Sequence, residues 1–291
     1  MFDLYIAMGL SVVAGAGLGV LVCRLSKGVP QRWLLTAAVV CVGLMFANGR
    51  LIRDRLWVAA LLPTSALPVA GNLFPLLAGI LGGIAWRLIP GRAWRKCISI
   101  VPLAAVCLYV SYGWIFGPLP ETSDAWADGV CIQTTEKSCS AAAAATLFAH
   151  YGIQTNETEM ARLCLTREIG TTMWGLYRGV RLKAADTPYR VAIMHGEIES
   201  LASLDGEPAL LVVGIEKGAD IDPRYEQEWQ WRPGVRHAVV FFGFAEDDLV
   251  EIGDPSVGRE FWRRKGVDDL WHRVAIRLVK RANRQGPMDQ S

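Results

Sequence analysis

The feature that most constrains this chain is the uneven distribution of its charged side chains. Between Leu4 and Pro118 the charges are confined to three short clusters, whereas from Glu121 onward they recur every few residues. The chain has 291 residues, 52% hydrophobic and 20% charged, which is an unusual composition for a protein that is soluble throughout. We therefore predict a helical membrane region (1–119), a polar domain (120–282) and a disordered tail (283–291).

The first part of the chain carries several segments suited to crossing a bilayer. The run Leu4–Cys23 is uncharged, and about 20 helical residues at ~1.5 Å each cover a hydrocarbon core of ~30 Å. Trp33–Ala47 and Cys97–Phe116 are further candidates. Leu56–Leu88 is interrupted by three prolines, so it predicts either one broken helix or two short ones. We prefer four spans, and five is the alternative.

Basic residues give these spans an orientation. The last span follows Arg87, Arg92, Arg95 and Lys96 and precedes acidic residues from Glu121 onward. Because basic flanks stay in the cytoplasm, the polar domain is predicted to lie outside a bacterial inner membrane. A cleaved signal peptide is disfavoured because the basic residues follow the first apolar run. The helices lack an acidic residue or histidine near mid-membrane, which favours a role as a lipid anchor.

Charge and cysteine spacing exclude several classes of function. The net charge is +2, and no basic stripe with interleaved aromatic residues indicates nucleic-acid binding. Cys131, Cys139 and Cys164 lie in the polar half without the close spacing of a zinc site. Cys131 and Cys164 are candidates for a disulfide in an oxidising compartment. We expect no metal and no organic cofactor.

Cys139 stands at the predicted start of a helix. Ser140–Tyr151 is dominated by helix-forming residues and is followed by Gly152, which suits a helix cap. A thiol at this position is stabilised as thiolate by the helix dipole and by free backbone N–H groups, which favours a nucleophile. The alternative is a buried structural cysteine.

The remaining pattern predicts helices followed by a sheet. Asn156 and Thr171 or Thr172 are candidate caps of two further helices. Short runs rich in β-branched and aromatic residues then predict antiparallel strands, namely Tyr189–Met194, Ala209–Val213, His237–Phe244, Leu249–Ile252 and Ala275–Val279. The fold class is thus a membrane helical region followed by an α+β domain with an antiparallel sheet.

Three residues complete a site with Cys139. His237 opens one strand and Asp254 closes the next, so a hairpin of these strands would bring base and carboxylate together. Gln133, six residues before Cys139, is placed to donate a hydrogen bond to an oxyanion. Taken singly, each also fits an ordinary surface or turn residue. The rival bases, none with a carboxylate as well placed, are His150, His195 and His272.

The motifs around these residues resemble a known family. The segment from Gln133 through SCSAAAAATLFAHYG, a Gly170–Thr171 pair, and HAVVFFGF followed by GDPSVG are similar to bacteriocin-processing cysteine peptidases that cut after double-glycine leaders. The resemblance spans roughly 130–278 and implies a papain-like fold. It implies Cys139 as nucleophile, with oxyanion donor, histidine and aspartate at the positions named above. Ser140 stands where that family usually has glycine.

The sequence therefore predicts a membrane-anchored cysteine endopeptidase acting on a secreted or membrane-linked peptide, for example a leader peptide. The expected partners are that peptide, the lipid bilayer and a separate export system. One alternative is a non-catalytic peptide-binding domain that serves such an exporter. Another is a membrane scaffold whose helices carry the function.

Overall fold

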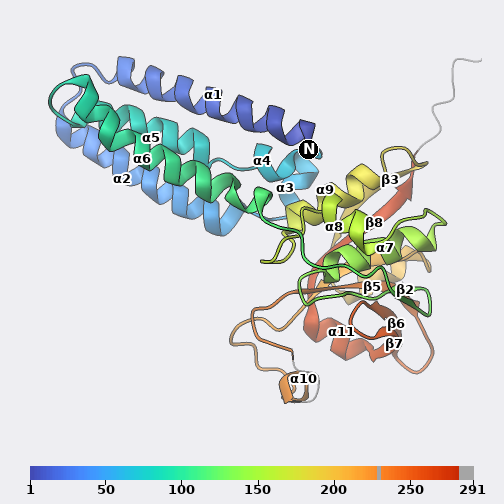
Figure 1. Ribbon diagram of the computed structural model, residues 1–291. Helices are drawn as coiled ribbons and strands as arrows, with labels where there is room; N and C mark the ends of the chain where they lie inside the picture. The colour runs from blue at the N-terminus through green and yellow to red at the C-terminus, as the bar shows by residue number, and fades with distance from the viewer. Residues whose placement is uncertain (228–230, 282–291) are drawn as a thin grey trace, which may run out of the picture. The chain divides into compact units, whose positions relative to one another are not determined.

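A computed structural model describes residues 1–227 and 231–281 (Figure 1). The predicted disordered tail, 283–291, lies outside the described residues. The chain divides into two compact units, Met1–Pro118 and Leu119–Ser291. The first is all helical and the second contains the sheet, so the predicted order of a helical region followed by an α+β domain is confirmed.

The first unit contains four helical stretches that are long and apolar enough to span a membrane: Phe2–Leu25, Gln31–Ile52, Leu67–Leu88 and Ala93–Tyr112. This agrees with the preferred count of four. The proline-interrupted stretch Leu56–Leu88 does not form one regular helix, because residues 62–66 and 71–73 are not helical. The helices of the unit are α1 (Phe2–Leu25), α2 (Gln31–Ala47) with the π-helical turn η1 (Asn48–Ile52), α3 (Trp57–Leu61), α4 (Leu67–Ala70), α5 (Phe74–Leu88), α6 (Ala93–Tyr112) and the 3₁₀ turn η2 (Gly113–Phe116).

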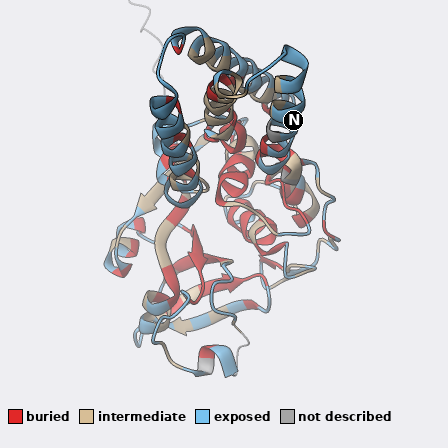
Figure 2. Ribbon diagram, turned by 90° about the vertical axis from the view of Figure 1, so that its left-hand side faces the viewer, coloured by how far each residue is buried: buried red, intermediate tan, exposed pale blue. Residues whose placement is uncertain are grey.

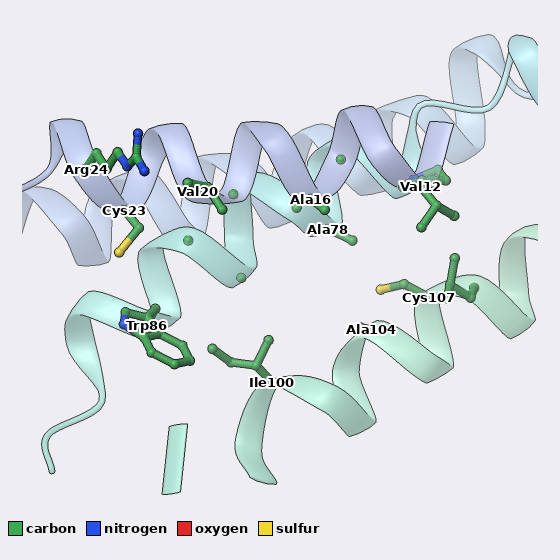
Figure 3. A pocket seen from close by; sticks show the side chains of 17 residues that line it. Val12, Ala16, Val20, Cys23, Arg24, Ala78, Trp86, Ile100, Ala104 and Cys107 are labelled. Atoms are coloured by element: carbon green, nitrogen blue, oxygen red, sulfur yellow. The ribbon is translucent and has the colours of Figure 1, made fainter. Parts of the chain in front are cut away.

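Glycines bring α1 and α5 into close contact. A Cβ atom on Gly19 would lie 2.7 Å from the carbonyl oxygen of Gly79, and one on Gly83 would overlap the backbone of Gly19. Small residues allow such close backbone approach between membrane helices. A cavity of about 550 Å³ lies between this pair and α6. Arg24 and Trp86 lie at one end of it and Cys107 lies toward the other (Figure 3).

After a short strand pair within residues 126–131, the second unit has three helices, and the second and third start at predicted caps. They are α7 (Cys139–His150), α8 (Glu157–Leu163) and α9 (Met173–Lys183). The Asn156 side chain accepts a hydrogen bond from the Glu159 N–H at 2.8 Å, and Thr172 accepts one from the Gly175 N–H at 3.0 Å. Each cap satisfies an N–H group that has no partner within its own helix.

The sheet of this unit has six antiparallel strands in the order β3-β8-β4-β5-β6-β7. Sequence periodicity missed the edge strand β7, whose sequence GREFWR places charged residues next to each other and aromatic residues next to each other. It also missed the start of β8, because VDDLWHRV divides between a helix and a strand. The strands are β3 (Tyr189–His195), β4 (Ala209–Val213), β5 (His237–Phe244), β6 (Leu249–Asp254), β7 (Gly258–Arg263) and β8 (Trp271–Lys280), besides the short pair β1 (Trp126–Ala127) and β2 (Val130–Cys131).

Both faces of the central strands are covered. The 3₁₀ segment η3 (Ile198–Leu204) and α11 (Arg264–Leu270) contribute to one core with β4, β5 and β6. Helix α7 packs against β5, and buried residues gather on it and on the central strands (Figure 2). Its five consecutive alanines, Ala141–Ala145, are fully buried because their small side chains let the helix lie close to its neighbours.

The two other cysteines of the second unit are free and buried. Cys164 packs against Gly179 of α9, where a Cβ atom would overlap the sulfur, and Cys131 lies on β2. The disulfide considered from the sequence is therefore absent, because each thiol is buried in its own packing environment.

Candidate active site

The hairpin of β5 and β6 brings His237 and Asp254 together. Val240 lies opposite Gly253, so Asp254 continues that register one step beyond, close to the first residue of β5. The Nε2 atom of His237 lies 2.7 Å from Oδ1 of Asp254. Both side chains are largely buried, with 16% and 7% of their area exposed. The strand-end placement inferred from the sequence thus yields a direct histidine–carboxylate contact.

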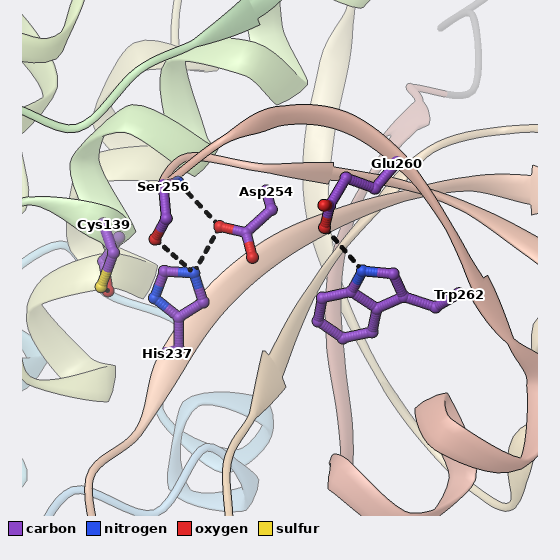
Figure 4. A network of polar contacts seen from close by, with 7 residues as sticks. Cys139, His237, Asp254, Ser256, Glu260 and Trp262 are labelled. Carbon is purple, nitrogen blue, oxygen red and sulfur yellow. Dashed lines mark hydrogen bonds and ion pairs between the residues drawn. The ribbon is translucent and has the colours of Figure 1, made fainter. Parts of the chain in front are cut away.

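Cys139 is the first residue of α7, at the end of a tightly bonded turn. Ser138 accepts a hydrogen bond from the Thr135 N–H at 3.1 Å, and its own N–H donates to the Thr135 carbonyl at 3.1 Å. The Cys139 sulfur faces the side of the His237 ring opposite to Asp254 (Figure 4). Because Nε2 contacts Asp254, the nitrogen directed to the sulfur is Nδ1.

The pKa values of this group favour a thiolate–imidazolium pair. Burial alone would raise the pKa of the Cys139 thiol, but the hydrogen bond and charge of His237 outweigh it and hold that pKa below its ordinary value. Burial opposes charging of His237, but the hydrogen bonds to Asp254 and Cys139 raise the pKa of the imidazole to about 10. Burial would raise the pKa of Asp254, yet the bond from His237 keeps it low.

The other two cysteines of the unit behave in the opposite way. Burial, together with the negative charges of Glu157 and Asp124, raises the pKa of Cys131 to about 12. Burial raises the pKa of Cys164 to about 12 as well. Since the thiolate is the reactive form, only Cys139 among these three has the electrostatic environment of a nucleophile.

Gln133 lies beside the turn that follows Asp254. Its backbone N–H donates to the Pro255 carbonyl at 2.8 Å, which ties the segment before α7 to the end of β6. Its Oε1 atom is buried, and no described residue donates a hydrogen bond to it. Buried amide oxygens usually have partners, so this unpaired acceptor is unusual.

Several neighbours of the site were missed from the sequence. The Ser256 N–H donates to Oδ1 of Asp254 at 2.7 Å, and the Ser256 hydroxyl oxygen lies 3.5 Å from Nε2 of His237. Asp followed two residues later by an N–H donor is a common turn motif, so GDPS carried this signal. Trp231 places its ring edge-on to His237, with centroids 5.7 Å apart, and the same ring contacts Trp262. No sequence signal pairs these rings.

The three rival histidines lie in other surroundings. The His150 ring, at the far end of α7, lies tilted against that of Phe242 with centroids 5.8 Å apart. His195 ends β3 and is exposed, and His272 of β8 lies 3.5 Å from Glu216. Within residues 1–227 and 231–281, no group of three or more His, Cys, Asp or Glu side chains has the arrangement of a metal site.

Comparison with known proteins gives structural matches only. No family model and no curated protein matches the chain. The chain is similar to the peptidase domain of Streptococcus ComA, a bi-functional ABC transporter involved in a quorum-sensing pathway, with 19% identity and a TM-score of 0.42, over 52% of this chain and 98% of that one. It is also similar to a double glycine motif protease from an AMS/PCAT transporter, in complex with the leader peptide, with 17% identity and a TM-score of 0.39, over 56% and 98%.

A third similar structure is the peptidase domain of Streptococcus mutans ComA, with 18% identity and a TM-score of 0.34, over 52% of this chain and 98% of that one. The sequence motifs resemble the same class of peptidase domain.

Proposed function

We propose that this protein is a membrane-anchored cysteine endopeptidase that hydrolyses a peptide bond through Cys139, His237 and Asp254. The observation that supports it most directly is the line of contacts from sulfur to imidazole to carboxylate at the N-terminus of α7. The packing of a buried structural cysteine does not require a charged histidine that is held by a buried aspartate. A nucleophile needs both, because one accepts its proton and the other orients the ring.

The proposed reaction has two halves. The Cys139 thiolate attacks the peptide carbonyl carbon, and the carbonyl π electrons move to oxygen and form an oxyanion. Collapse of this intermediate breaks the C–N bond, and the His237 imidazolium gives its proton to the leaving amine. Neutral His237 then takes a proton from water as that water attacks the thioester, which releases the acid, the thiolate and the imidazolium.

The oxyanion is assigned to Gln133 and to the start of α7. The first backbone N–H groups of a helix have no partner inside it, so the Cys139 N–H is a suitable donor. The Gln133 carboxamide supplies the second hydrogen bond. The pair would stabilise negative charge where it develops during attack.

We place the peptidase unit on the extracytoplasmic side and assign it a secreted or membrane-linked peptide, with leader peptides as the first class to examine. The supporting observations are the four apolar helices and the basic cluster before α6, which keeps that end in the cytoplasm. Since α6 is the last of the four spans, the chain after it continues on the side of the membrane opposite to the cytoplasm. A peptide delivered there by a separate export system would meet the site after crossing.

The proposal is tested by incubating the detergent-solubilised full-length protein with a peptide library and identifying products by mass spectrometry. The matched control is the same preparation alkylated with iodoacetamide. Cleavage at defined bonds that alkylation removes is the expected result. Binding of peptides without any product would instead identify a non-catalytic binding module.

Replacing Gln133 with alanine is expected to lower kcat by about 10²–10³-fold, the usual loss for one oxyanion donor. Gln133→Glu keeps the size of the side chain but supplies an acceptor in place of a donor, so it should be at least as defective. Both are measured by steady-state peptide hydrolysis. Wild-type kcat in both variants would exclude Gln133 from the oxyanion site.

A further inference from the structure

The segment that carries Gln133 is fixed by an unusual set of contacts. Four successive backbone N–H groups donate to four different parts of the unit. Cys131 donates to the Thr146 hydroxyl at 2.8 Å, Ile132 to the Ala125 carbonyl at 2.8 Å, and Gln133 to the Pro255 carbonyl at 2.8 Å. The Thr134 N–H donates to Oε1 of Glu157 at 2.7 Å. Only this last acceptor is a charged side chain.

Glu157 is the first residue of α8, and it is fully buried. Its Oε2 atom lies 2.6 Å from the Thr134 hydroxyl oxygen and 3.2 Å from the Ser123 backbone nitrogen. The carboxylate thus receives three donors from two loop segments. Charge-assisted hydrogen bonds of this kind are shorter and stronger than neutral ones, and a buried carboxylate is retained only where such donors satisfy it.

We propose that Glu157 is a positioning residue that holds the carboxamide of Gln133 in place for the oxyanion; this inference rests on the proposed function. The contact at Thr134 acts on the residue directly after Gln133, while Pro255 holds Gln133 itself from the side of Asp254. Glu157 therefore fixes the segment 133–134 on one side, and Pro255, which follows β6, fixes it on the other. The hydrogen bonds of Glu157 are made with Thr134 and Ser123, and neither Cys139 nor His237 takes part in them.

The Glu157 carboxylate is suited to fixing this segment because it is buried and bonded to the Thr134 N–H. A shift of the backbone at Gln133 away from the site would need the Thr134 N–H to leave a buried carboxylate acceptor, which is costly in a water-poor interior. A displacement of about 1 Å at a positioning group can cost on the order of 10²-fold in rate. Loss of the Glu157 contacts should consequently lower kcat, which reports the chemical step.

The test compares Glu157→Gln with Glu159→Gln in the full-length protein. Glu159 lies on the same helix but pairs with Lys183 at 2.8 Å, so it controls for loss of an acidic side chain from α8. We expect Glu157→Gln to lower kcat about 10-fold with little change in KM, because a neutral amide replaces a charged acceptor of three donors. Glu159→Gln should keep wild-type kcat.

Two further measurements separate positioning from general damage to the fold. The alkylation rate of Cys139 by iodoacetamide needs no oxyanion donor, so it should be unchanged in Glu157→Gln. In a Gln133→Ala background, adding Glu157→Gln should lower kcat no further, because the group that it positions is gone. Both results together would support the proposal.

Additive losses in the double variant, a slower alkylation of Cys139, or a wild-type kcat in Glu157→Gln would each overturn it. These outcomes all presuppose a wild-type protein that cleaves peptides. A wild-type protein that cleaves none would instead remove the proposed function, and this inference with it.

Discussion

Replacing Cys139 with alanine should abolish peptide hydrolysis, with a fall in kcat on the order of 10⁵-fold or more, as expected when a covalent nucleophile is lost. The remaining site cannot use another thiol, because burial raises the pKa of Cys131 and Cys164 to about 12 and keeps both protonated near neutral pH. The measurement is product formation by mass spectrometry at fixed enzyme and peptide concentrations.

Cys164→Ala is the matched control for Cys139→Ala. It removes a buried thiol of the same unit that packs against Gly179 of α9. It should keep turnover within a few-fold of wild type, although the packing loss costs about 1 kcal/mol of stability. Equal turnover in Cys139→Ala and in wild type would contradict the assignment of the nucleophile.

Replacing His237 with alanine should lower kcat by at least about 10³-fold, because the variant loses both the general base and the proton donor to the leaving amine. It should also deactivate the thiol. The imidazolium is what holds the pKa of Cys139 below its ordinary value, while burial acts in the opposite direction. Without the ring, burial dominates, and that pKa should rise above the ordinary value.

Turnover and alkylation of Cys139 at neutral pH are therefore expected to fall together in His237→Ala. His195→Ala is the matched control, since it removes an exposed histidine at the end of β3. Rapid alkylation of Cys139 that persists in His237→Ala would mean that another group activates the sulfur.

The parts of the fold that the sequence predicts well are those governed by neighbouring residues. Asn156 and Thr172 cap the helices as predicted, because capping depends on the chemistry of a single turn. The β5–β6 hairpin followed from two runs rich in β-branched and aromatic residues joined by a short polar turn. Edge strand β7 was missed because its charged and aromatic residues do not alternate, so it lacks the period-2 pattern of a strand.

The site divides in the same way. His237 and Asp254 could be paired from the sequence because they occupy the ends of adjacent strands in one hairpin. Glu157 could not be linked to Gln133, because their separation along the chain is bridged only by tertiary packing of α8 on the loop before α7. The contact between Trp231 and His237 could not be predicted either, because it depends on the path of the long loop between β4 and β5.

The central claim is that His237 activates the Cys139 sulfur, and the pH dependence of its alkylation tests this most directly. The rate of iodoacetamide labelling at Cys139 is followed by peptide mapping, with Cys131 and Cys164 as internal references. A thiol of lowered pKa remains a thiolate at lower pH, so the rate should already reach its plateau below the ordinary thiol pKa of about 8.5. A rate that rises through about pH 8.5 or above, as for an unactivated or buried thiol, would contradict the account.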